Sequence, residues 1–177
     1  MMDKVTTIMA TGKYILVGLL MVFGMTVKAQ EIKWMTWEQA DAANAKQPRK
    51  IFVDLYTDWC GWCKKMDATS FKDPAVVKLM GEKFYAVKLN AEQKEAINWR
   101  GSSFEWVAGG RGGVHRLAYE LVDGRLSYPT FVILDEEFRR IMISPGYKPG
   151  EELIKELQFA SGNHYMNTTW EQYKAKL

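Results

Sequence analysis

Two cysteines stand two residues apart, and they are the only cysteines in the chain of 177 residues. Cys60-Gly61-Trp62-Cys63 follows a short apolar run typical of a buried strand and begins a segment with helical character. A Cys-x-x-Cys motif at a strand-to-helix junction is typical of thiol–disulfide exchange. Free backbone N–H groups at the helix start stabilise a thiolate, which is the reactive form of cysteine. The spacing therefore predicts that Cys60 attacks a partner disulfide and that Cys63 resolves the mixed disulfide.

A metal clip is the competing interpretation of the cysteine pair. Zinc generally takes four ligands, and the chain offers only His115 and His164 to complete a set. Neither has a cysteine or carboxylate at ligand spacing, and we interpret His115 as a helix-surface residue and His164 as a tail residue. Two thiolates would suit a soft ion such as Cu(I), yet only Met66 adds a soft ligand nearby. We expect redox chemistry without a bound cofactor or metal, and a soft-metal or client-binding module is the alternative of another class.

The first 29 residues have the layout of a secretory signal. Residues 14–27 are apolar except for two glycines and Thr26, which is short for a membrane span of about 20 residues. Val27 and Ala29 predict cleavage after Ala29 and a periplasmic or secreted product, with an uncleaved membrane anchor as the alternative. Cleavage leaves 148 residues, enough for one domain, and lowers the formal charge from +3 to +1. This charge gives no reason to expect nucleic acid as a partner, and two cysteines argue against a disulfide scaffold.

Helical and strand patterns alternate along the chain. We expect helices at 34–46, from Cys60 onwards, at 74–80, 114–121 and 151–160, and strands at 51–56, 84–89, 130–134 and 138–143. Thr36 with Gln39 forms a capping box for the first helix, and Asp73 caps the helix that begins at Pro74. Residues 92–99 are compatible with a helix and 104–108 with another turn, whereas the glycine-rich run at 109–113 predicts a break in regular structure. The tail at 161–177 should add one short helix, capped by Thr168 or Thr169.

These motifs resemble those of thioredoxin-fold proteins over roughly residues 50–160. The likeness is carried by VDLYTDWCGWCKKM, AVKLN, SYPTFVILD and Gly146. It implies an α/β, thioredoxin-like three-layer fold, in which helices cover both faces of a central mixed sheet of four to five strands. Trp62 stands where thioredoxin itself has proline. Secreted thioredoxin-like proteins with Trp or another residue there are similar, so the resemblance is to the family and not to thioredoxin proper. Residues 30–177 would form a single monomeric domain with a helical tail.

The resemblance also implies roles for residues outside the cysteine pair. Asp54 matches the family's buried Asp, which helps to deprotonate the second cysteine, and burial raises the pKa of a carboxyl group. An Asp that faces water on an edge strand is the alternative. Lys88 matches the family lysine near that Asp, although an ordinary exposed lysine fits nearly as well. Pro129 matches a cis-proline that faces the cysteines, and a proline tolerated at a strand start is the alternative.

Substrate contacts are expected around the cysteines. Gly61 and Trp62 lie between them, and Trp62 should be partly exposed and offer an apolar face to a client. The backbone of Tyr128, just before the proline, is suited to pair with an extended client segment. Trp59 should pack against the fold and order the loop. The other tryptophans are expected in core or satellite packing: Trp34, Trp37, Trp99, Trp106 and Trp170.

The chain departs from thioredoxin most clearly between Lys88 and Pro129, which stand 41 positions apart. The excess falls on residues 91–113, where we expect an insertion that covers or extends the client groove, with a passive surface excursion as the alternative. The resemblance implies a thiol–disulfide oxidoreductase for protein clients, supplied with electrons by a membrane-embedded donor. Similar small reductases carry Gly at the position of Gly61, which favours the reducing direction. A disulfide oxidase or isomerase is the nearest alternative.

Overall fold

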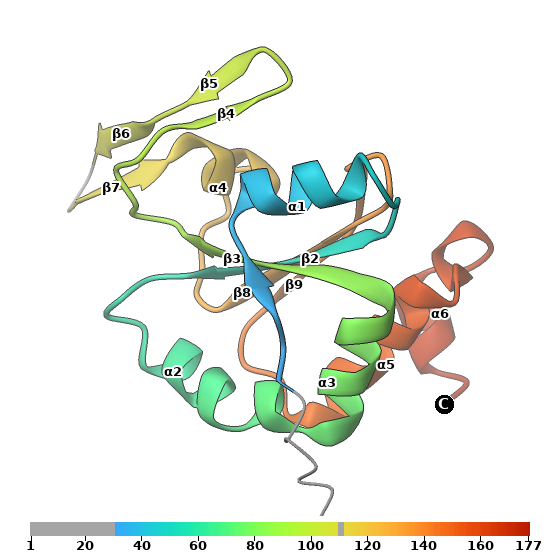
Figure 1. The fold of residues 1–177 in the computed structure, drawn as a ribbon. Helices are drawn as coiled ribbons and strands as arrows, with labels where there is room; N and C mark the ends of the chain where they lie inside the picture. The colour runs from blue at the N-terminus through green and yellow to red at the C-terminus, as the bar shows by residue number, and fades with distance from the viewer. Residues whose placement is uncertain (1–30, 110–111) are drawn as a thin grey trace, which may run out of the picture.

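A mixed sheet runs through the centre of the computed structural model, which describes residues 31–109 and 112–177 (Figure 1). Its strands within these ranges are β1 (Trp34–Met35), β2 (Lys50–Tyr56), β3 (Phe84–Asn90), β8 (Thr130–Leu134) and β9 (Arg140–Pro145). They lie in the order β1-β3-β2-β8-β9. β1, β3 and β2 are parallel, and β8 and β9 complete the sheet by antiparallel pairing. The signal expected at 1–29 lies outside the described residues.

Helices cover both faces of this sheet (Figure 1). They are α1 (Trp37–Asn44), α2 (Gly61–Ala68), α3 (Pro74–Lys83), α4 (Arg116–Leu121) and α5 (Gly150–Ser161), with a 3₁₀ turn η1 (Ser70–Lys72) after α2. Alternation along β2 sends Ile51, Val53 and Leu55 into the core shared with α1 and α4. Phe52 points to the opposite face, into the core shared with α2, α3 and α5. The expected three-layer α/β architecture is confirmed.

Side-chain caps determine where the first helices begin. Thr36 accepts a hydrogen bond from the N–H of Gln39, whose side chain accepts one from the N–H of Thr36. α1 therefore begins at Trp37, and the first residues of the helix expected at 34–46 instead form β1, which pairs with β3. Asp73 likewise caps α3 by accepting hydrogen bonds from the first free N–H groups.

The segment between β3 and α4 forms two hairpins, so the helix expected at 92–99 is wrong. β4 (Ile97–Trp99) pairs with β5 (Ser102–Phe104), and β6 (Trp106–Gly109) pairs with β7 (Gly112–His115). Arg100 and Gly101 connect the first pair with φ values of 49° and 78°, as a two-residue type I′ turn requires. Ile97 and Phe104, which are register partners, are buried in the core beside α1. These residues therefore form strands with alternating buried and exposed side chains, and not the helix that their spacing in the sequence suggests.

The glycine-rich run is also more regular than predicted, because Gly109, Gly112 and Gly113 lie in strands. α4 begins only at Arg116, and His115 ends β7. The interpretation of His115 as a helix-surface residue is wrong, since its side chain is fully buried. The backbone N–H of His115 donates to the carbonyl oxygen of Ala91 at 2.7 Å. Burial lowers the pKa of this imidazole.

The tail after α5 folds back onto the domain. It contains a 3₁₀ turn, η2 (His164–Met166), and a short helix, α6 (Trp170–Lys174). Thr169 caps α6 with a capping box that includes Gln172. The ring of Phe159 on α5 packs edge-on against Trp170, with 5.5 Å between ring centroids, and His164 is exposed beside Tyr173.

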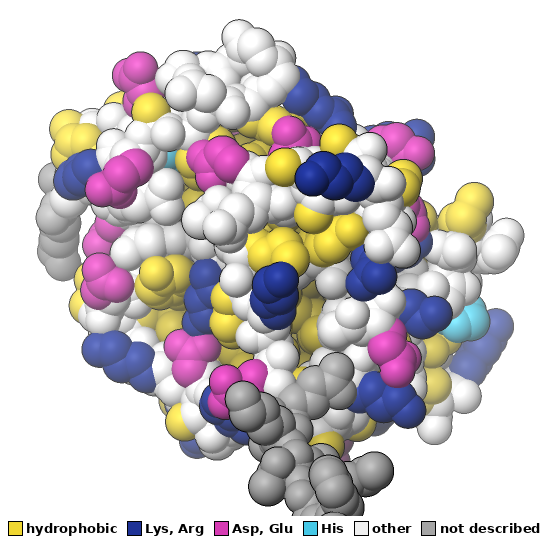
Figure 2. Space-filling model, viewed as in Figure 1, with side chains coloured by type: hydrophobic (Ala, Val, Ile, Leu, Met, Phe, Trp, Pro, Cys, Tyr) yellow, Lys and Arg dark blue, Asp and Glu magenta, His cyan; other side chains and the backbone are white. Residues whose placement is uncertain are grey.

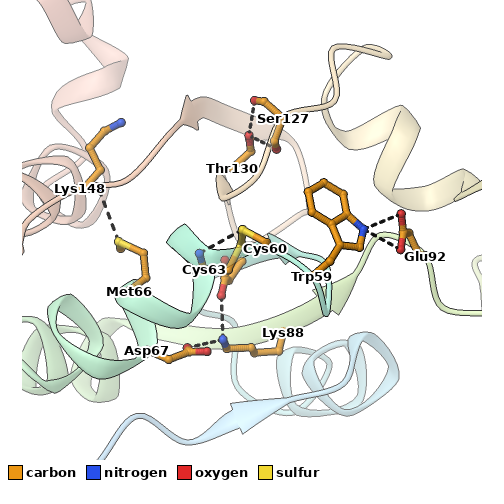
Figure 3. The surroundings of a disulfide bond; sticks show 11 residues. Trp59, Cys60, Cys63, Met66, Asp67, Lys88, Glu92, Ser127, Thr130 and Lys148 are labelled. Atoms are coloured by element: carbon orange, nitrogen blue, oxygen red, sulfur yellow. Dashed lines mark hydrogen bonds and ion pairs between the residues drawn. A yellow bond between two sulfur atoms is a disulfide. The ribbon is translucent and has the colours of Figure 1, made fainter. Parts of the chain in front are cut away.

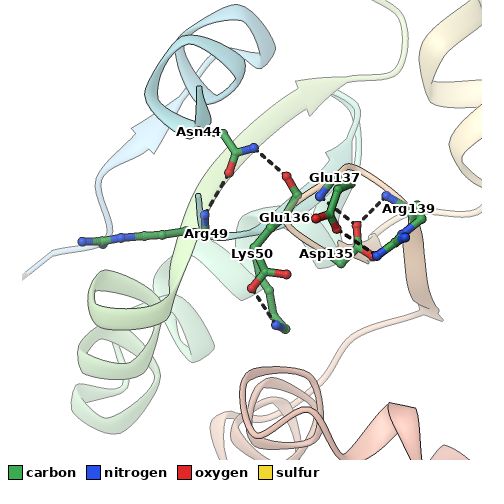
Figure 4. A network of polar contacts seen from close by, with 7 residues as sticks. All are labelled: Asn44, Arg49, Lys50, Asp135, Glu136, Glu137 and Arg139. Carbon is green, nitrogen blue, oxygen red and sulfur yellow. Dashed lines mark hydrogen bonds and ion pairs between the residues drawn. The ribbon is translucent and has the colours of Figure 1, made fainter. Parts of the chain in front are cut away.

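A polar network ties the start of β2 to the turn between β8 and β9 (Figure 4). The side chain of Asn44 donates to the carbonyl oxygen of Glu136 at 2.7 Å and accepts from the N–H of Arg49 at 2.9 Å. Lys50 Nζ lies 2.9 Å from a carboxylate oxygen of Glu136. These contacts anchor one end of β2, and the other end leads into the cysteine motif.

The surface drawn in Figure 2 carries interspersed Lys, Arg, Asp and Glu side chains, in keeping with the small net charge. Across residues 31–109 and 112–177, no helix combines the length and the apolar character needed to cross a membrane.

Candidate active site

Cys60 and Cys63 form a disulfide at the start of α2 (Figure 3). The chain leaves β2 at Tyr56 and reaches Cys60, the N-cap residue of α2, after a short loop. The N–H of Cys63 donates to Cys60 Sγ at 3.0 Å. The two cysteines are only 4% and 3% exposed. The start of α2 therefore directs a backbone donor at the sulfur of Cys60, an arrangement that stabilises a thiolate there.

Asp54 is buried on the face of β2 that α2 covers. It is 1% exposed, and β2 lies between β3 and β8, so the edge-strand alternative is wrong. Its Oδ2 lies 3.0 Å from Lys88 Nζ. Burial raises the pKa of Asp54 from 3.8 to about 6, against the opposing charge of Lys88 and with a small contribution from Asp67. This carboxyl group can therefore gain or lose a proton near neutral pH, as a general acid or base must.

Lys88 connects Asp54 to the protein surface. Its ammonium group also forms an ion pair with Asp67, an exposed residue of α2 (Figure 3). Burial lowers the pKa of Lys88, but the two carboxylates more than offset this and raise the pKa above its ordinary value. Lys88 Nζ lies 5.0 Å from the ring centroid of Trp34 and 5.1 Å from that of Tyr56. A row of three charges thus runs from the buried face of β2 beneath α2 to solvent.

The peptide bond between Tyr128 and Pro129 is cis, as the resemblance implies. The ring of Tyr128 lies edge-on to Trp59, with 5.8 Å between centroids, so this bond lies beside the cysteine loop. Thr130 Oγ1 donates to the carbonyl oxygen of Ser127 at 2.8 Å (Figure 3). That hydrogen bond closes the turn that presents Tyr128 and Pro129 to the site.

Two exposed tryptophans border the disulfide. Trp62 is 56% exposed, as expected, and tilts against Tyr147 with 5.3 Å between centroids. Lys65 Nζ lies 4.9 Å from the centroid of the Trp62 ring. Trp59 is 66% exposed, more than Trp62, although its ring packs against Tyr128. Its indole N–H finds a surface partner, because it donates to the carboxylate of Glu92 at 3.1 Å (Figure 3).

Sequence reasoning missed several neighbours of the disulfide. Asp67 stands four residues after Cys63, a spacing that places two side chains on the same side of a helix and could have revealed it. Glu92 and Tyr147 carry no local signal, because they meet the tryptophans only through the tertiary fold. Gly61 is exposed between the cysteines, with open space around the position of a Cβ.

The arrangement is suited to a two-electron exchange between a dithiol and a disulfide. It combines a sulfur at a helix start, a second sulfur one turn further along, and a buried carboxyl group with a raised pKa. Among the residues that the structure describes, no group of three or more His, Cys, Asp or Glu side chains is placed to hold a metal ion.

Known proteins resemble this chain in sequence and in fold. The uncharacterized protein B0495.5 of Caenorhabditis elegans is 25% identical over 162 residues, which cover 81% of this chain and 22% of that protein. The thiol:disulfide interchange protein DsbD of Pectobacterium atrosepticum is 47% identical over 36 residues, which cover 20% of this chain and 6% of that protein. The chain thus spans less than a quarter of the length of these relatives.

Solved structures share the fold at low sequence identity. The structure titled DsbH Oxidoreductase matches with a TM-score of 0.54 and 15% identity, over 77% of this chain and 89% of that one. A thioredoxin from Thermus thermophilus matches with a TM-score of 0.54 and 20% identity, over 73% of this chain and 87% of that one. The family model Thioredox_DsbH, described as "Protein of unknown function, DUF255", matches residues 22–177. Since this match spans most of the sequence, the chain belongs to the Thioredox_DsbH family.

Proposed function

We propose that the protein is a thiol–disulfide oxidoreductase that exchanges electrons with protein clients through Cys60 and Cys63. The observation that carries this proposal is the disulfide at the start of α2, with the buried carboxyl group of Asp54 on the strand face beneath that helix. Membership of the Thioredox_DsbH family supports it, as do the names of two similar proteins, a thiol:disulfide interchange protein and an oxidoreductase.

In the reducing direction, the cycle starts from a Cys60 thiolate and a Cys63 thiol. Cys60 Sγ attacks one sulfur of a client disulfide, so that a Cys60–client bond forms while the client disulfide breaks and its other sulfur leaves as a thiolate. Asp54 takes the proton of the Cys63 thiol, and the resulting thiolate attacks Cys60 Sγ. This step forms the Cys60–Cys63 disulfide and releases the second client thiolate. The client has gained two electrons, which a dithiol donor protein then restores to the cysteine pair.

Charges around the pair favour the reducing direction. A dithiol protein is a strong oxidant when its reduced form is stabilised. Here two carboxylates, Asp54 and Asp67, share the single charge of Lys88. Their combined charge opposes the stabilisation of a Cys60 thiolate by the start of α2, and to that extent it favours the disulfide form.

We place this activity in an extracytoplasmic compartment because residues 1–29 have the layout of a secretory signal. An exported reductase has no access to soluble cytoplasmic reductants, so its electrons would come from a membrane-embedded dithiol donor. Equilibration with glutathione buffers tests the direction. A reductase should have a potential near the roughly −270 mV of thioredoxin, and a potential near the roughly −120 mV of DsbA would make it an oxidase.

Reduction of insulin disulfides, with dithiothreitol as the electron source, tests the proposed roles. Cys60→Ser should abolish the rate above that of dithiothreitol alone. Pre-reduced Cys63→Ser, mixed with insulin after dithiothreitol has been removed, should accumulate a mixed disulfide visible by mass spectrometry. Release of the client by this variant at the wild-type rate, without dithiothreitol, would overturn the assignment of the resolving cysteine. Titration of the reduced protein with Zn²⁺ and Cu(I) is the companion experiment. Tight stoichiometric binding without disulfide turnover would replace the proposal with a metal-handling role.

A further inference from the structure

We infer that the groove between the cysteine loop and the β6–β7 hairpin binds an extended apolar segment beside the cysteine of a client protein. This inference rests on the proposed function and names the feature of the client that the site selects. The groove has a volume of about 610 Å³, within the range of ligand pockets in proteins. Its larger lining side chains are Trp59, Glu92, Val107, Val114, Leu126 and Tyr128.

The groove leaves large apolar side chains open to water. Trp59 is 66% exposed, Val107 on β6 is 53% exposed, and Leu126 is 37% exposed. Apolar side chains that gather in one exposed hollow mark interaction surfaces, whereas singly scattered ones need no explanation. The three come from separate parts of the chain, so only the tertiary fold creates this concentration.

Glu92 is the one charged side chain among the described lining residues. Both of its carboxylate oxygens lie 3.1 Å from the indole nitrogen of Trp59. The carboxylate thereby orients the indole ring, whose edge also meets Tyr128. With no cation in the described lining to receive an acidic segment, the groove favours an apolar one.

The groove adjoins the candidate active site through two of its lining residues. Trp59 directly precedes Cys60, Tyr128 directly precedes Pro129, and the rings of Trp59 and Tyr128, whose centroids lie 5.8 Å apart, together form one wall of the groove. The opposite wall is the hairpin, through Val107 and Val114, which are register partners on β6 and β7. A client chain joined to Cys60 by a mixed disulfide would enter this hollow within a few residues of its own cysteine. The hairpin therefore extends the client site, one of the two roles expected of the segment at 91–113.

The test compares two client peptides that differ only beside the cysteine. Each forms a disulfide-linked dimer, with two Leu or Val residues on either side of the cysteine in one peptide and Ser or Asn in the other. Wild-type protein, kept reduced with dithiothreitol, should reduce the apolar peptide with a kcat/KM about tenfold higher, as burial of one aliphatic side chain predicts. Val107→Asp and Leu126→Asp should each bring the ratio of the two values to about one.

Met166→Asp is the matched control, because Met166 is 70% exposed on the tail, away from the groove. It should leave both kcat/KM values unchanged. Equal wild-type rates for the two peptides would overturn the inference and leave the oxidoreductase proposal standing. Failure to reduce either peptide or a small disulfide such as oxidised glutathione would overturn the proposed function itself. If sedimentation analysis shows a dimer, and Val107→Asp makes the protein monomeric, the groove binds a second copy of the chain and not a client.

Discussion

Lys88 Nζ lies 3.0 Å from Asp54 Oδ2, and these residues are register partners on adjacent parallel strands. The ammonium group opposes the effect of burial without cancelling it, and the pKa of Asp54 remains raised at about 6. The charge beneath α2 therefore changes close to neutral pH. Both the stability of the protein and its redox kinetics should respond to this change.

Asp54→Asn should stabilise the disulfide form above pH 6. A carboxyl group with a raised folded-state pKa contributes stability below its unfolded pKa and loses it as pH rises through the folded pKa. For Asp54 this window runs from 3.8 to about 6, and the ionised side chain costs up to about 3 kcal/mol above it. In urea unfolding, the variant should gain about twice as much free energy of unfolding over the wild type at pH 8 as at pH 5. Equal gains at the two pH values would contradict this assignment.

The same variant should slow resolution of the mixed disulfide. Loss of a general base commonly costs about 100-fold in rate, so we expect a deficit of that size at pH 7. The deficit should shrink as pH rises, because hydroxide then deprotonates Cys63 directly. Stopped-flow single turnovers between pH 6 and pH 9 provide the measurement. A deficit that stays constant with pH would indicate a purely structural role for Asp54.

Substitutions of the two partners should move the pKa of Asp54 in opposite directions. Lys88→Met removes the nearby positive charge and should raise the pKa above 6, whereas Asp67→Asn removes a negative charge and should lower it. Carbon-13 NMR titration of the Asp54 carboxyl carbon measures both shifts. Lys72→Met, which removes an exposed lysine paired with Glu31, serves as the control and should leave the pKa in place. Shifts of the same sign in both variants would refute this account.

Two neighbouring glycines should respond differently to alanine. A Cβ on Gly113 would overlap the ring of Trp106 and lie 2.6 Å from the carbonyl oxygen of Val107, whereas a Cβ on Gly112 meets no heavy atom within 4 Å. Gly113→Ala should therefore loosen the β6–β7 hairpin, and Gly112→Ala should not. Amide hydrogen exchange at Val107 and Val114 reports the difference. Unchanged protection in Gly113→Ala would show that the ring moves aside without cost.

Local signals account for the parts of the fold that the sequence predicts correctly. The apolar run at 51–56 and the capping pair Thr36 and Gln39 act over a few residues, and the structure contains both features. The burial of Asp54 can also be predicted from the sequence, because its neighbours along the strand are apolar on both sides.

The errors concern residues whose surroundings come from distant parts of the chain. Trp59 is largely exposed, and its indole N–H bonds to Glu92, 33 positions away. His115 is buried at the end of β7, and its backbone N–H bonds to Ala91, which lies before both hairpins in the sequence. The first hairpin has a sequence signal, because apolar and polar residues alternate from Ile97 to Phe104. This signal is weak, since the turn at Arg100-Gly101 is short and the two strands have only three residues each.

The pairing of Asp54 with Lys88 has a consequence for how the sheet assembles. A slip of one residue between β2 and β3 would set Asp54 opposite Val87 or Leu89 and turn Lys88 to the other face of the sheet. In the slipped arrangement the carboxylate of Asp54 would be buried in the core without a cationic partner. An uncompensated buried charge costs about 3 to 5 kcal/mol. The residue proposed as the base of the redox cycle therefore also selects the correct strand alignment during folding.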